Sequence, residues 1–153
     1  MIEINNLTNN PVDEKFLKKV AEIVLKNERK KKNLSIALVY AARIKRLNQK
    51  YRKKNRATDI LSFTYDDLGE IVICPSEVKQ NAKKFTPLEI IGAKNKKSKS
   101  LTEFKSDFRT ELFRVLIHGI LHILGYDHEK SGKDAKIMEE KQEYYLSLIK
   151  NQS

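Results

Sequence analysis

Three histidines stand within eleven residues, and the chain contains no others. His118 and His122 are four residues apart, so on a helix their side chains lie on one face within reach of a single ion. Gly125 can end that helix and turn the chain, which lets His128 approach the same point from a loop. Three imidazoles that converge in this way leave a fourth tetrahedral position for water, as in catalytic zinc sites. The pattern therefore predicts one zinc ion per chain, held by His118, His122 and His128.

A zinc site of this type favours hydrolytic chemistry. The ion lowers the pKa of bound water from about 15.7 toward about 7, which supplies a nucleophile at neutral pH. In the alternative interpretation, two of the histidines merely pack in the core. That interpretation is disfavoured because burying imidazoles in an apolar helix costs free energy unless they have partners.

The same segment fits HxxxHxxGxxH, the ligand pattern of metzincin proteases, in which a Glu after the first histidine acts as general base. Here that position is Gly119. A peptidase without this carboxylate has no evident group to deprotonate water and protonate the leaving amine. Phosphodiester cleavage depends on the carboxylate less, because a metal ion and a cation on the phosphate can supply much of the chemistry. The glycine therefore argues against a protease and for another hydrolysis.

Composition limits the classes of partner that we expect for this chain. Its 153 residues include 31 Lys and Arg against 20 Asp and Glu, a net charge of +11 that attracts RNA, DNA or anionic lipid. The single cysteine, Cys74, excludes an intramolecular disulfide or a cysteine zinc cluster, and we expect it to be a small buried hydrophobe. The N-terminus does not read as a secretory signal, and no apolar run approaches the roughly 18 residues of a membrane span. We therefore expect a cytoplasmic protein with no membrane segment.

Hydrophobic periodicity predicts the elements that position the histidines. Helices are expected from the Asn10–Pro11 turn to about 29 and over about 42–54, 75–87, 108–124 and 132–149, and strands over 2–7, 34–40, 58–65 and 69–74. The last two strands are close enough to form an antiparallel hairpin. The histidine-bearing helix is apolar on nearly every side, which is typical of a buried central helix. These elements predict one α+β domain over 1–153, with a small mixed four-stranded sheet and about five helices. The central helix that carries the histidine motif makes the expected fold zincin-like.

Residues 118–128, HGILHILGYDH, resemble the signature HGxLHxxGYDH of the bacterial YbeY rRNA maturation factors, which are metal-dependent endoribonucleases. The segments LNQKYRKKNRATDILSF (47–63), GEI (69–71) and MEEKQEYYL (138–146) extend the likeness over about residues 34–149. The chain departs from the family at Thr64, where many relatives have Pro, and in the lysine-rich segment 92–106, which we expect to be a mobile loop.

The resemblance implies that His118, His122 and His128 bind zinc and that Arg52 is the functional arginine of the cleft. Arg52, His118 and His122 are thus the expected catalytic residues. An arginine suits the role because its planar fork pairs bidentately with phosphate. Without the family, a solvated residue in the basic run 50–56 would be the better interpretation of Arg52.

The resemblance also implies the substrate and the partners. The expected function is a single-strand-preferring, zinc-dependent endoribonuclease that matures the 3′ end of 16S rRNA and acts in ribosome quality control. The expected partners are ribosomal RNA and the small ribosomal subunit, with ribosomal proteins and an Era-type GTPase. Basic residues at 50–56 and 94–105 would hold the RNA backbone, with an affinity that depends on salt.

Several alternatives stay open. The protein could instead be an RNA-binding ribosome-assembly factor with a mainly structural metal, or a zinc peptidase or other zinc hydrolase. Asp127 either orients a ligand imidazole or caps a turn, and Glu111 either does the same from the histidine-bearing helix or is a plain surface residue. Thr58 and Ser62 lie near a strand that we expect at the edge of the cleft.

Overall fold

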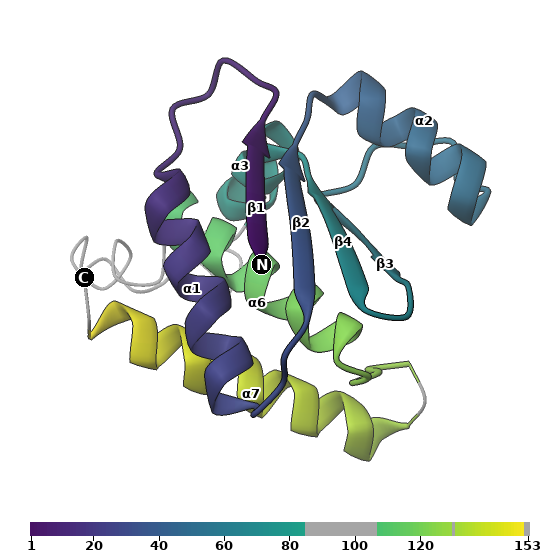
Figure 1. The fold of residues 1–153 in the computed structure, drawn as a ribbon. Coiled ribbons are helices and arrows are strands. Elements are labelled where there is room, and N and C mark those ends of the chain that lie inside the picture. The colour runs from purple at the N-terminus through teal and green to yellow at the C-terminus, as the bar shows by residue number, and fades with distance from the viewer. Residues whose placement is uncertain (85–106, 130, 152–153) are drawn as a thin grey trace, which may run out of the picture.

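The computed structural model describes residues 1–84, 107–129 and 131–151 (Figure 1). Its centre is a mixed four-stranded sheet in the order β1-β2-β4-β3. The strands are β1 (Ile2–Asn6), β2 (Asn33–Leu38), β3 (Ile60–Thr64) and β4 (Leu68–Ile73). The helices are α1 (Glu14–Asn27), α2 (Ala41–Arg52), α3 (Pro75–Lys84), α6 (Phe108–Ile123) and α7 (Gly132–Lys150). The described part of the chain thus confirms the predicted α+β class, the mixed sheet and the five helices.

Strand β3 forms one edge of the sheet. β1 and β4 both run parallel to β2, whereas β3 runs antiparallel to β4 as the predicted hairpin. Tyr65 N donates to Leu68 O at 2.8 Å and Cys74 N donates to Asp59 O at 2.9 Å, so the odd-numbered residues of this strand bond to β4. Hydrogen-bonded pairs alternate in an antiparallel ladder. The backbone groups of Ser62 and its even-numbered neighbours therefore point to the open edge.

The histidine-bearing helix α6 is the predicted central helix. It packs against α1, α3, α7, β3 and β4 and crosses behind the sheet in the view of Figure 1. Its apolar side chains share one core with those of α1, α7 and the sheet face formed by Leu34, Ile36 and Ile71. Burial of this surface, at about 25 cal/mol per Å² of apolar area, fixes α6 against the sheet.

Helix α2 covers the opposite face of the sheet, beside β3. Ile44 of α2 is fully buried with Leu61 and Cys74, and Phe63 packs against this smaller cluster. Cys74 is thus the buried residue that the sequence predicts. Because side chains alternate along a strand, Ile60 and Ser62 face α6 whereas Leu61 and Phe63 face α2. Strand β3 therefore lies between the helix of the histidines and the helix that ends in Arg52.

Several predicted boundaries need correction. Helix α1 begins at Glu14 rather than at Pro11, because the Asp13 side chain accepts a hydrogen bond from Phe16 N at 3.0 Å and caps the helix there. Ser131 caps α7 in the same way, accepting from Asp134 N. The lysine-rich segment and the predicted end of the third helix lie outside the described residues. No helix in the described ranges is long and apolar enough to cross a membrane.

Candidate metal site and cleft

The three histidines meet at the C-terminal end of α6. His118 and His122 occupy successive turns of the helix, and Gly125 follows it with a φ of +105°, a conformation that favours glycine. The turn returns His128 to the helix, so the ring centroids of the three imidazoles lie 4.9 to 5.2 Å apart. One ligand nitrogen from each ring lies within 4.8 Å of the other two. The structure thus positions the three residues to hold one metal ion.

The ring geometry fits a tetrahedral ion. Ligand bonds of about 2.0–2.1 Å place the nitrogens of a tetrahedral zinc site about 3.3 Å apart. His122 Nε2 and His128 Nδ1 are 3.1 Å apart. His118 Nδ1 faces Gln142 Oε1 at 2.8 Å, so this nitrogen donates to Gln142 and leaves Nε2 as the ligand atom. Three protein ligands leave the fourth position open, and these contacts do not identify the metal.

Burial favours the protonation state that binds a metal. It lowers the pKa of His118 below its usual range, against the opposing effect of the hydrogen bond to Gln142. Burial also lowers the pKa of His122, and the neighbouring His118 and His128 add to the effect. Both imidazoles are therefore more readily neutral at physiological pH, as metal ligands must be.

The residues that orient these imidazoles differ from those expected. Gln142, on α7, contacts His118 directly and was not among the sequence candidates. Asp127 accepts a hydrogen bond from Glu129 N at 2.8 Å, so it caps the turn, as one of its two interpretations predicts. Glu111 pairs with Arg114 and not with a histidine, so a role in orienting the ligands is wrong for it.

A buried carboxylate fixes the turn that carries His128. Glu28, which is only 8% exposed, follows α1 and accepts hydrogen bonds from Tyr126 Oη at 2.6 Å and Lys141 Nζ at 2.9 Å, and another from Tyr145 Oη. It thereby joins α1, α7 and the turn after α6. Burial by itself raises the pKa of Glu28, but these three donors outweigh it and hold the pKa below 4.5.

We expect Glu28→Gln to lower the free energy of unfolding by about 1.5–3 kcal/mol at neutral pH, because hydrogen bonds to a charged group are lost. The folded pKa of Glu28 lies below the unfolded value of 4.5, so this stabilisation is present above about pH 4.5 and is lost as the pH falls through the folded pKa. Urea unfolding at pH 7 and pH 3 measures the difference between variant and wild type. A difference in stability that stays the same at both pH values contradicts the prediction. The control Glu22→Gln, at an exposed position on α1, should change stability little.

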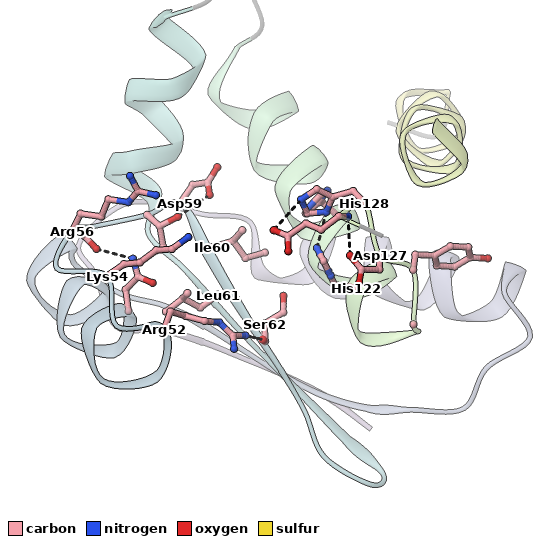
Figure 2. A pocket seen from close by; sticks show the side chains of 16 residues that line it. Arg52, Lys54, Arg56, Asp59, Ile60, Leu61, Ser62, His122, Asp127 and His128 are labelled. Atoms are coloured by element: carbon pink, nitrogen blue, oxygen red, sulfur yellow. Dashed lines mark hydrogen bonds and ion pairs between the residues drawn. The ribbon is translucent and has the colours of Figure 1, made fainter. Parts of the chain in front are cut away.

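The histidines line a cavity of about 720 Å³ that also contains Arg52. Figure 2 shows Arg52 and Ser62 on one side of it and His122 and His128 on the other. Arg52 Nη2 donates to Ser62 O at 2.8 Å, and its guanidinium carbon lies 5.1 Å from the centroid of the Phe63 ring. The structure therefore places the expected arginine in the same cavity as the histidines and holds its guanidinium at the edge of β3.

The rest of the cavity wall comes from the segment between α2 and β3. Lys54 and Arg56 add positive charge, and the buried Asn48 holds their loop by donating from Nδ2 to Arg56 O at 2.9 Å. Thr58 and Ser62 line the cavity, as their predicted place near the cleft suggests. Asp59 lies in the same wall, accepts from Asn81 Nδ2 at 3.2 Å, and was not among the sequence candidates. The described walls thus combine a metal-binding side with a mainly cationic one.

Gly119 brings α6 close to β3. A Cβ atom at this position would lie 2.5 Å from Ile60 Cδ1 and 3.1 Å from Ser62 Oγ. Contacts this short leave little room for any side chain at position 119 unless the Ile60 side chain shifts. Close helix–strand packing therefore accounts for the glycine at the position where metzincins carry their Glu.

We expect Gly119→Ala to destabilise the fold by about 1–2 kcal/mol, because overpacking outweighs the helix propensity that alanine adds. Ile60→Val removes Cδ1, so Gly119→Ala should cost close to nothing in that background. Chemical unfolding of the wild type, both single variants and the double variant measures the coupling. Equal costs of Gly119→Ala in the two backgrounds would show that this contact does not require glycine.

Comparison with known proteins places the chain among endoribonucleases. Residues 3–150 match the family model described as "Endoribonuclease YbeY". An Endoribonuclease YbeY from Thermotoga maritima is 38% identical over 136 residues, which cover 87% of this chain and 78% of the relative. That from Thermosipho melanesiensis is 34% identical over 147 residues, covering 94% of this chain and 93% of the relative. A solution structure of a T. maritima protein superposes with a TM-score of 0.66 at 35% identity, covering 99% of this chain and 91% of that chain.

Proposed function

The chain belongs to the YbeY endoribonuclease family, and from this premise we propose that it is a zinc-dependent enzyme that cuts single-stranded RNA in the maturation of the 16S rRNA 3′ end. Membership supports the coarser role, an endoribonuclease. One observation carries the finer proposal: three imidazole nitrogens within 4.8 Å of one another share a cavity with Arg52. A metal-binding group thus faces a phosphate-binding group across a space open to substrate.

Each residue of the cavity has a proposed task. His118, His122 and His128 hold the ion, and Gln142 keeps the first of them turned toward it. Zinc held by these three residues would supply Lewis-acid chemistry and an acidified water. Arg52 pairs with a non-bridging phosphate oxygen and stabilises the negative charge that builds up during cleavage.

The wall around Arg52 prepares it for this task. Ser62 O and the Phe63 ring hold the guanidinium before substrate arrives, so less conformational freedom is lost on binding. Lys54 and Arg56 contact the neighbouring backbone phosphates in this proposal. Because such contacts release counterions, binding should weaken as the salt concentration rises.

We further propose ribosomal RNA and the small ribosomal subunit as the partners, with ribosomal proteins and an Era-type GTPase, and a place in ribosome quality control in the cytoplasm. The net charge of +11 supports a polyanionic partner of this kind. Cross-linking in cells, followed by sequencing of the bound RNA, should recover the 3′ end of small-subunit rRNA. Recovery of unrelated RNA only would count against this partner.

Purified zinc-loaded protein tests the function against its alternatives. We expect cleavage of single-stranded RNA, much slower cleavage of the same sequence as a duplex, and none of a peptide library. RNA binding without cleavage would favour an assembly factor with a structural metal. Peptide cleavage would identify a zinc peptidase instead.

A further inference from the structure

A second groove continues the cavity across the edge of the sheet. It has a volume of about 380 Å³ and is lined by Arg52, Ser62, Phe63, Thr64, Tyr65 and His122. Arg52, Ser62 and His122 also line the metal cavity, so the two spaces share a wall. Because Ser62 faces α6 and Phe63 faces α2, the groove passes over the open edge of β3. A strand of substrate leaving the metal site can therefore follow it.

The aromatic side chains of this groove differ in what they contact. The Phe63 ring lies beneath the Arg52 guanidinium and has the Tyr51 ring against it, with centroids 5.3 Å apart. Tyr65, next along the chain after Thr64, is 53% exposed. No ring or cation contact to the Tyr65 side chain occurs in the described part of the chain. Phe63 thus supports the arginine, whereas Tyr65 offers a ring to a ligand.

The open edge of β3 is poorly suited to an added peptide strand. Strand addition needs the outward carbonyls of the edge as acceptors. The outward carbonyl of Ser62 already accepts from Arg52, and the guanidinium lies over the edge. A nucleic acid strand needs no such ladder, since it binds through stacked bases and paired phosphates. The groove therefore favours a nucleotide over a peptide.

We propose that this groove binds the nucleoside next to the scissile phosphate, with its base stacked on Tyr65. The proposal rests on the proposed function, because Arg52 must hold the phosphate that this nucleoside carries. Stacking on an aromatic ring tolerates any base, because every base has a π-face. A base in a duplex is already stacked and paired, so the groove selects single strands.

Tyr65→Ala tests the proposal in the zinc-loaded full chain. We expect the KM for single-stranded RNA to rise roughly 10- to 100-fold, with kcat changed much less. Single-stranded DNA of the same sequence, if a gel shows that it is not cut, allows binding to be measured without cleavage. Its Kd should rise by a similar factor. A series of RNAs, each lacking the base of one nucleotide, locates the stacked base. Loss of the base at one position should weaken binding to the wild type but should leave binding to Tyr65→Ala unchanged.

Two controls separate stacking from other effects. Tyr65→Phe keeps the ring and should bind like the wild type. Tyr144→Ala removes a similarly exposed tyrosine, 56% exposed on α7 and lining neither cavity, and should change nothing. Far-ultraviolet circular dichroism checks that each variant is folded.

The outcomes are distinguishable. A Tyr65→Ala protein that binds and cuts single-stranded RNA like the wild type overturns this proposal and leaves the proposed function intact. Displacement of the DNA by a short extended peptide also overturns it, in favour of strand addition. A wild type that neither binds nor cuts RNA overturns the proposed function and this inference with it.

Discussion

His122→Ala is expected to abolish metal binding and, with it, RNA cleavage. Loss of a group that only orients a metal ligand already costs about 10- to 100-fold in metal affinity, so loss of a ligand should cost more than about 100-fold. The three imidazoles form a nearly equilateral triangle, with the His122 ring centroid 4.9 Å from that of His118 and 5.0 Å from that of His128. Without it, only two imidazoles remain to hold an ion.

Metal content per chain after dialysis, together with the initial rate on single-stranded RNA, measures this effect. Glu111→Gln is the matched control, because Glu111 lies on the same helix and pairs with Arg114 outside the metal cavity. It should retain one metal per chain and the wild-type rate. An His122→Ala protein that still holds one metal and cuts RNA at the wild-type rate would show that the three histidines are not the working site.

Arg52→Glu should lower kcat/KM for RNA by roughly 100- to 1,000-fold while leaving the metal in place. Removal of one positioned donor to a developing negative charge has an effect of that size in other hydrolases. Arg52→Lys restores the charge but not the planar fork, so we expect an intermediate rate. The metal content should stay near one per chain in both variants, because Arg52 is not a ligand.

Arg46→Glu makes the same change of charge on the exposed side of α2, away from both cavities. It should weaken RNA binding only a few-fold and mainly at low salt, through the loss of long-range attraction. Equal losses in Arg46→Glu and Arg52→Glu would mean that Arg52 acts only through net charge. Such a result would exclude a direct role of Arg52 in cleavage.

The convergence of the three histidines could be predicted because their geometry is local. His118 and His122 are one helical turn apart. The positive φ of Gly125 turns the chain back toward the helix, and His128 follows only three residues later. The sheet and the central helix follow for a similar reason, since alternating and helical hydrophobic patterns are properties of short segments. The sequence also placed Arg52 correctly at the cleft, but only through the family resemblance.

The groups that complete the site come from distant segments. Gln142 is 24 residues from His118, and Tyr126 is 98 residues from Glu28. No periodicity links such positions, because their approach depends on how α1, α6 and α7 pack. Glu111 illustrates the converse error: it has a favourable helical spacing from His118, but it pairs with Arg114 instead. Sequence spacing therefore identifies which residues share a face of one helix, whereas the packing of the helices decides which residues form contacts.

Zinc titration of the metal-free protein tests the central claim most directly, that one ion on His118, His122 and His128 drives RNA cleavage. The protein is stripped with a chelator, dialysed, and given increasing zinc while the initial rate on single-stranded RNA is recorded. We predict no cleavage without metal and a rate that rises linearly until one zinc per chain and then stays constant. Full cleavage by the metal-free protein, or no cleavage at one zinc per chain, would contradict the account.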